Sequence, residues 1–239
     1  WSGVLLGLWF CRAAFADAQW RNWARVFDPQ RLRRMMQVNG DILVRSVLLT
    51  GSFTTFLFLG ASFGDLTLAA NQILLQFVHI TSYALDGFAF AAEALVGSAL
   101  GAGSHRKLHR AGLLSSQWGL VTALGLSLAF ALGGGLLIDL MATAPEVRSE
   151  ARAYLPWAAL LPVFSLASYM FDGIFIGATW TTEMRQAMIR SVALYAAALL
   201  LLVPLWGNHG LWAALLVLNT ARGITLARRY PSLAAQVKQ

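Results

Sequence analysis

Three acidic side chains stand inside long apolar stretches of this sequence, where ionisable groups are energetically costly. Asp86 and Glu93 follow a run without formal charge at 66–85, and Asp172 lies near the end of another apolar run. A carboxylate at membrane depth faces protein or water and usually marks an ion or substrate pathway. We therefore predict that Asp86 and Asp172 bind and release a coupling ion, with Glu93 as a further member of the site.

A fourth acid, Asp41, has a basic residue close to it in the sequence. Asp41 and Arg45 are four residues apart near the start of an apolar stretch, so one helical face can hold them as a pair. The rise of 1.5 Å per residue places all four acids at a similar depth on the inner side of the membrane, with Arg45 as the nearest internal base.

Two interpretations of these charged residues stay open. In the first, burial disfavours the charged carboxylate and a nearby guanidinium favours it, so that the group can bind and release a proton or sodium ion near neutral pH. In the second, Arg45 and the acids form a static ion-pair latch between the inner ends of the helices.

Smaller polar side chains precede Asp86 along the same predicted helix. We predict that Asn71, Gln76 and Tyr83 line a substrate path. The alternative is that the amides hydrogen-bond to neighbouring helices, as Asn and Gln usually do in membranes. His79 is expected to be a hydrogen-bonded core residue and not a proton relay.

The composition indicates which elements position these residues. The 239 residues are 58% hydrophobic and 12% charged, and about 25% charged is usual for a soluble domain. We therefore predict an all-α, polytopic membrane protein. Residues 1–37 would be the end of a preceding helix and a basic loop, and 230–239 a cytoplasmic tail. The six-helix lobe, 38–229, would hold spans at 38–63, 66–100, 111–138, 153–177, 187–205 and 211–227.

The basic residues predict how this lobe is oriented. The net charge is +7, and of 18 Lys and Arg residues only Arg148 and Arg152 fall in loops placed outside. This one-sidedness is typical of cytoplasmic loops, so we expect a multi-pass protein of the inner (plasma) membrane with a cytoplasmic carboxyl terminus. Membrane lipids, and not nucleic acid, are the expected partners of the positive charge.

Several sequence patterns that suggest catalysis lack the context they need. Residues 60–64 match G-x-S-x-G, but they end a membrane helix and lack the strand and the triad partners of a hydrolase. The segment 101–107 lacks phosphate-loop spacing, and His105 and His109 have no third metal ligand nearby. Cys11 is the single cysteine. We expect no enzyme, no metal centre and no cofactor other than H⁺ or Na⁺.

Three segments carry a family resemblance: LAANQILLQF at 68–77, SYALDGFAFAAEALVGSALGAGS at 82–104 and FDGIFIGATWTTEMRQAM at 171–188. In these the chain resembles the multidrug and toxic compound extrusion (MATE) transporters, in the DinF-like branch. The resemblance implies twelve helices in two lobes, of which this chain is the carboxy-terminal one. The partner implied is the missing amino-terminal lobe.

The resemblance also implies antiport, in which a small lipophilic, often cationic, substrate leaves as a proton or sodium ion enters. Asp86 and Asp172 occupy the family's Asp-Gly positions, and Asp41 with Arg45 its pair on the first span. A lipid-linked saccharide flippase of the wider superfamily is the alternative, and it predicts a more cationic cavity. An intramembrane enzyme would need a nucleophile or a set of metal ligands that converge, and the sequence offers none. A scaffold that transports nothing would not need three acid-bearing helices at one membrane depth.

Overall fold

The computed structural model describes residues 2–12 and 27–236, and this part of the chain is helical with short turns and no strand. Two compact units divide at Gly40, one covering Trp1–Gly40 and the other Asp41–Gln239. The elements are α1 (Ser2–Phe10), α4 (Pro29–Ala61), α5 (Asp65–Gly101), α6 (His105–Met141), α7 (Pro145–Gly177), α8 (Thr181–Trp206), α9 (Asn208–Ala227) and α10 (Tyr230–Gln236).

Six helices in the described part are long and apolar enough to cross a membrane: α4 to α8, and α9 together with the residues that follow it. The prediction of an all-α membrane protein with six spans is confirmed. From α4 to α9, successive helices are joined by turns of a few residues, so neighbours in sequence run antiparallel. The protein is therefore a multi-pass membrane protein.

The first long helix begins before the predicted first span. Helix α4 starts at Pro29, inside the segment taken for a basic loop, because Asp28 and Pro29 together form a helix start. The Asp28 carboxylate accepts a hydrogen bond from the Gln30 amide at 2.9 Å, and Pro suits the first helical position. Arg31, Arg33 and Arg34 are therefore helical, and the predicted loop arginines at 21 and 25 lie outside the described residues.

Helices also replace most of the two later loops that were predicted. Helix α7 begins at Pro145 and α8 at Thr181, so the predicted loops at 139–152 and 178–186 shrink to short turns. At the first of these turns Asp139 pairs with Arg152, at 2.6 Å. Pro156 and Pro162 lie within α7 without ending it, as is tolerated where neighbouring helices satisfy the freed backbone groups.

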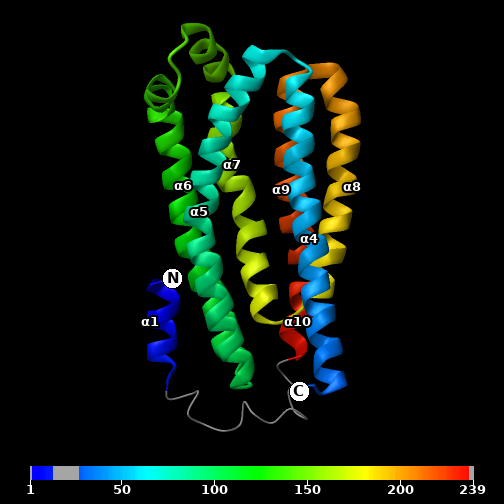
Figure 1. Cartoon of the computed structure of the whole chain (residues 1–239). Coiled ribbons are helices and arrows are strands. Elements are labelled where there is room, and N and C mark those ends of the chain that lie inside the picture. The colour runs from blue at the N-terminus through cyan, green and yellow to red at the C-terminus, as the bar shows by residue number, and fades with distance from the viewer. Residues whose placement is uncertain (1, 13–26, 237–239) are drawn as a thin grey trace. The chain divides into compact units, whose positions relative to one another are not determined.

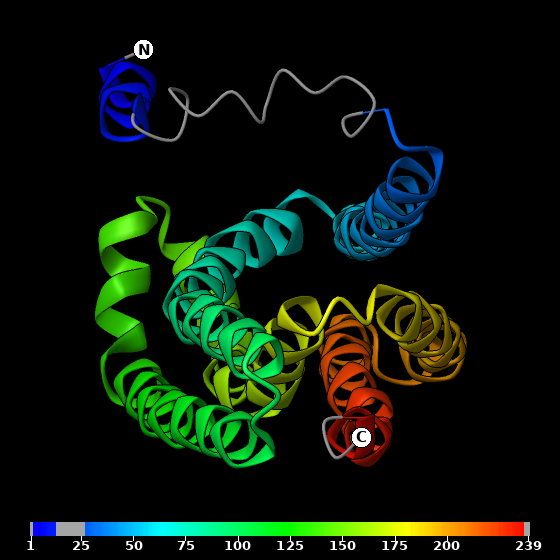
Figure 2. The ribbon, with the colours of Figure 1, turned by 90° about the horizontal axis from the view of Figure 1, so that it is seen from below.

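Within the unit Asp41–Gln239, α5, α6 and α7 lie together, and α8 and α9 lie together beside them (Figures 1 and 2). Helix α7 joins the two groups, since it packs against α5, α6 and α9. Side chains connect α4 to α9 and to α8. The ring of Phe56 on α4 meets that of Trp212 on α9 edge to face, with 5.0 Å between centroids. The Tyr195 hydroxyl on α8 donates a hydrogen bond to the Ser52 carbonyl on α4. This arrangement encloses a polar space between α4, α5, α7 and α9.

Candidate functional site: a charged cavity between four helices

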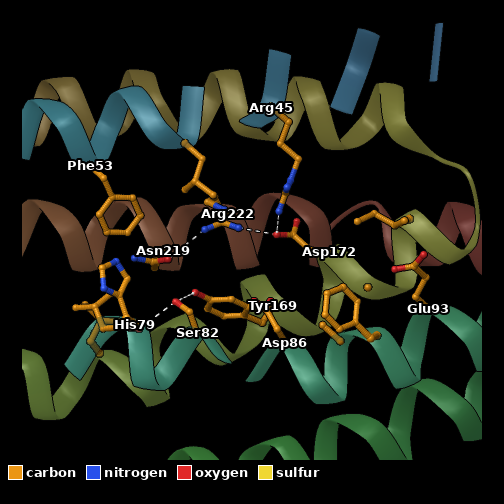
Figure 3. Close-up of a pocket in the computed structure, with 17 residues that line it drawn as sticks. Arg45, Phe53, His79, Ser82, Asp86, Glu93, Tyr169, Asp172, Asn219 and Arg222 are labelled. Atoms are coloured by element: carbon orange, nitrogen blue, oxygen red, sulfur yellow. Dashed lines mark hydrogen bonds and ion pairs between the residues drawn. The ribbon is translucent and has the colours of Figure 1, made fainter. Parts of the chain in front are cut away.

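A cavity of about 380 Å³ lies among α4, α5, α7 and α9 (Figure 3). Its wall is a mixture of aromatic, aliphatic and ionisable side chains. Five of the lining residues are charged at neutral pH by type, and they come from all four helices. They are Arg45, Asp86, Glu93, Asp172 and Arg222.

Asp172 is held by two arginines from two different helices. The guanidinium Nη2 of Arg222 on α9 lies 2.5 Å from Asp172 Oδ2, and Arg45 on α4 donates to the same oxygen. Asp172 and Arg222 are buried, and Arg222 also donates to the Asn219 side chain at 3.2 Å. Figure 3 shows both arginines converging on the carboxylate. Two charge-assisted bonds thus compensate the charge of Asp172 and join α4 and α9 to α7.

Asp86 and Glu93 differ from Asp172 in having no such partner. Asp86 is half-buried on α5, and it forms no hydrogen bond or ion pair with any residue that the structure describes. It is nevertheless close enough to interact electrostatically with Asp172 and with both arginines. Glu93, two turns further along α5, also lines the cavity without a partner among the described residues. The cavity thus contains two carboxylates that no described residue contacts directly through a hydrogen bond or an ion pair.

Close packing of α5 on α7 sets the position of these carboxylates. Gly173 lies directly against the backbone carbonyl of Ala89, and Gly177 against that of Glu93, so that a Cβ atom at either glycine would overlap the α5 backbone. Small residues four apart let two helices approach this closely in a membrane. Since Asp172 precedes Gly173, the same contact that seats the helices brings Asp172 toward the face of α5 that carries Asp86.

Asp41 belongs to a different cluster, which corrects two predictions. Its buried carboxylate lies 2.6 Å from Nη1 of Arg185 on α8 and accepts hydrogen bonds from Thr181 and Thr182, at 3.1 and 2.7 Å. Asp41 and Arg45 therefore do not pair, because each has a partner on another helix. The four acids also do not converge on one site, since Asp41 does not line the cavity.

The residues predicted to line a substrate path do not line this cavity. Asn71 is fully buried and exchanges two hydrogen bonds with Asn208, at 2.8 and 3.0 Å, while accepting a third from Trp212. Asn71 therefore hydrogen-bonds to a neighbouring helix, which was the alternative to lining a substrate path. Gln76 and Tyr83 are exposed on α5, Tyr83 to 77%.

The prediction for His79 is wrong. Its side chain is exposed and not part of the core, and it lines the cavity that also holds Asp86. Its ring stacks on that of Tyr83, with 6.4 Å between centroids.

Sequence reasoning missed Arg222 and the polar groups around it. Arg222 is an interior charge in an otherwise uncharged run, and Asn219 stands three residues before it on the same helical face. This isolated charge was the signal that could have found it. On α7, Tyr169 was also missed, and its hydroxyl lies 2.5 Å from that of Ser82 on α5. These groups extend the polar surface of the cavity.

The geometry suits reversible cation binding better than covalent catalysis. Among the described residues no three His, Cys, Asp or Glu side chains gather as metal ligands. A proton needs only one carboxylate without an ion-pair partner, and Asp86 provides one among the described residues. Because Asp86 interacts with Arg45 and Arg222, neutralising it also changes the forces on the helices that carry these arginines.

Comparison with known proteins finds a family model and relatives that match most of the chain. The MatE family model matches residues 42–202. The DNA damage-inducible protein F of Escherichia coli (strain K12) is 40% identical over 195 residues, which are 82% of this chain and 42% of that protein. Protein DETOXIFICATION 43 of Arabidopsis thaliana is 29% identical over 200 residues, 83% of this chain and 38% of its own length. The chain spans less than half the length of these relatives.

Solved structures show the same fold. The Vibrio cholerae MATE transporter VcmN, in its bent form, superposes with a TM-score of 0.81 at 19% identity, covering 97% of this chain and 54% of that one. A MOP superfamily transporter from Pyrococcus furiosus gives a TM-score of 0.67 at 14% identity, with 82% of this chain and 44% of that chain covered.

Proposed function

The chain belongs to the MatE family, and on this premise we propose that it works in a secondary active transporter. The transporter exports lipophilic or cationic compounds in exchange for protons or sodium ions. The family assignment agrees with the resemblance found in the sequence. The substrate class and the coupling ion are the parts that we propose.

One observation carries this proposal: Asp86 lines the charged cavity without a hydrogen-bond or ion-pair partner in the described part of the chain. The other buried carboxylates, Asp41 and Asp172, already have arginine partners. Asp86 is therefore the acid best suited to gain and lose a coupling ion, with Glu93 as a second candidate. Asp172, Arg45 and Arg222 form the charged framework that responds to it.

The coupling step follows from electrostatics. With Asp86 ionised, α5 is attracted to Arg45 on α4 and Arg222 on α9. When Asp86 binds a proton or a cation, this attraction is lost, while Asp172 keeps both arginines. The change favours a different packing of α5 against the other helices, and transport requires such a difference in free energy between two conformations.

The surroundings of the lobe follow from the same proposal. The chain spans less than half of its curated relatives, so we propose that a second, amino-terminal lobe completes the substrate path. The one-sided distribution of basic residues supports an inner (plasma) membrane location with the carboxyl terminus in the cytoplasm. Lipids, the second lobe and the exported compound are the proposed partners.

One observation supports the alternative function, a lipid-linked saccharide flippase. Arg222 adds a second arginine to Arg45 in the cavity wall, so the wall holds three carboxylates and two guanidinium groups. An anionic lipid pyrophosphate would bind to the arginines and a cationic drug to the acids. Three acids against two bases favour the exporter.

The test uses the full-length protein in proteoliposomes. Efflux of a cationic dye is measured under a pH gradient and, separately, under a sodium gradient, for the wild type, for Asp86→Asn and for the control Asp65→Asn. Asp65 is an exposed acid in the first turn of the same helix and does not line the cavity. We expect gradient-driven efflux to be lost in Asp86→Asn and kept in Asp65→Asn.

Full efflux by Asp86→Asn under the gradient that drives the wild type would overturn the role of Asp86. Absence of efflux in the wild type under both gradients, together with binding of a polyprenyl pyrophosphate, would favour the flippase.

A further inference from the structure

An apolar groove runs along the face of α9 that points away from the charged cavity. Its volume is about 430 Å³, and it is bounded by Phe164 of α7, Leu194 of α8 and side chains of α9 from Leu216 to Arg228. Asn219 and Arg222 turn to the cavity instead. Helix α9 packs against both α7 and α8, and the view along the helices (Figure 2) shows it between them. The groove is thus separate from the proposed ion site.

The length of the groove matches one leaflet of a bilayer. Leu216 and Arg228 are twelve residues apart, which is about 18 Å along a helix. Half of the hydrocarbon core is about 15 Å thick. The groove therefore has the length and the apolar lining that suit one extended fatty acyl chain.

Two arginines without partners among the described residues lie on the two helices, α8 and α9, that bound most of this groove. Arg228 lines it, and Arg190 precedes Leu194 by four residues on α8, which places it on the same helical face. Both side chains are exposed, and neither makes a hydrogen bond or an ion pair with any residue in the described part of the chain. No acid lines the groove. The positive charge of both arginines is therefore uncompensated.

Other arginines in the same parts of α8 and of the chain after α9 do form ion pairs with acidic residues of the protein. Arg185 on α8 pairs with Asp41, and Arg229 pairs with Glu183 at 3.4 Å. Arg190 and Arg228 are exposed and have no such acid partner in the part of the chain that the structure describes, and Arg228 lines the apolar groove. An arginine at the boundary of a membrane span needs an anion from elsewhere, and basic side chains there attract anionic lipid headgroups.

We propose that this groove binds an anionic phospholipid, with one acyl chain against α7, α8 and α9 and the phosphate between Arg190 and Arg228. The chain contributes apolar contact, and the two guanidinium groups distinguish an anionic headgroup from a zwitterionic one. Bound there, the lipid covers the seam between α8 and α9. This proposal depends only on the lobe being in a membrane, so it stands or fails independently of the transport function.

Native mass spectrometry of the full-length protein in detergent tests the proposal. The protein is mixed with phosphatidylglycerol or with phosphatidylcholine of the same acyl chains, and the bound lipid is counted. Variants are Arg190→Gln, Arg228→Gln, the double variant and Val217→Trp, which fills the groove. Arg106→Gln is the charge-matched control, since Arg106 is exposed at the start of α6 and lines neither space.

We expect the wild type to prefer phosphatidylglycerol and each Arg→Gln variant to lose about fivefold of that preference. Val217→Trp should reduce binding of both lipids at this site, and Arg106→Gln should behave as the wild type. Equal binding of the two lipids by the wild type would overturn the proposal. So would an unchanged preference in the double variant, or an equal loss in Arg106→Gln, which would mean that net charge alone attracts the lipid.

Discussion

Arg222 and Asp172 form an ion pair inside the helix bundle, with 2.5 Å between Nη2 and Oδ2 and with both side chains buried. Arg45 donates to the same carboxylate oxygen from a third helix. One acid is thereby shared by two cations, while Asp86 on the facing helix has no partner among the described residues. The electrostatics of the lobe depend on this unequal distribution of partners.

Loss of Arg222 should destabilise the lobe strongly. Arg222→Gln removes one of the two guanidinium groups that compensate a buried carboxylate, and breaking a buried pair costs about 3 kcal/mol. Thermal unfolding in detergent should show a midpoint lower by roughly 5 to 10 °C. Arg106→Gln, at an exposed position, should leave the midpoint unchanged. A drop no larger than that of this control would show that Arg45 alone satisfies Asp172.

The close contact between α5 and α7 predicts a position-specific effect of one methyl group. Gly173→Ala places a Cβ against the Ala89 carbonyl, so the helices must separate, at a cost of about 1 to 3 kcal/mol. Gly125→Ala makes the same change at a helical glycine with open space around it, where alanine stabilises by about 0.5 to 1 kcal/mol. Unfolding midpoints should therefore move in opposite directions. Equal shifts would contradict the packing described.

The amide pair of Asn71 and Asn208 predicts a measurable coupling energy. Asn71→Ala leaves Asn208 and Trp212 with unmade hydrogen bonds in a buried site, which costs about 1 to 3 kcal/mol. In a double-mutant cycle with Asn208→Ala, the two losses should not add. Gln72→Ala, at an exposed position on the same helix, serves as the control. Additive losses would mean that the two amides act independently.

Asp41 should behave as a latch and not as a coupling residue. Asp41→Asn weakens its contacts with Arg185 and the two threonines, so α4 should attach less firmly to α8 and the unfolding midpoint should fall. Because Asp41 lies outside the charged cavity, dye efflux in proteoliposomes should remain driven by the same ion gradient. Uncoupled efflux in this variant, at unchanged stability, would place Asp41 in the ion pathway after all.

The fold could be predicted from the sequence because long apolar runs leave few alternatives in a membrane. The bounds of the spans were less certain, since charged residues continue a helix past the bilayer: α4 starts at Pro29, and α7 includes Arg148 and Arg152. Helix starts depend on local hydrogen bonds such as that of Asp28. These bonds act over a few residues and leave little trace in hydropathy.

The acids of the site were also predictable, but their partners were not. A lone carboxylate in an apolar run, such as Asp86, is visible in the sequence. Arg45 pairs with Asp172 and not with Asp41, although Asp41 is only four residues away in the sequence. This pairing depends on how three helices pack. Periodicity within one helix carries no information about such contacts. The isolated charge of Arg222 is likewise visible in the sequence, but its pairing with Asp172 appears only when α7 lies beside α9.

The central claim is that Asp86, and not Asp172, gains and loses the coupling ion. Infrared difference spectra of the full-length protein test this directly, by following the protonated-carboxyl band as pH or sodium concentration is changed. We expect this band to change in the wild type and in Asp172→Asn, and the change to disappear in Asp86→Asn. A band change that persists in Asp86→Asn and disappears in Asp172→Asn would contradict the account.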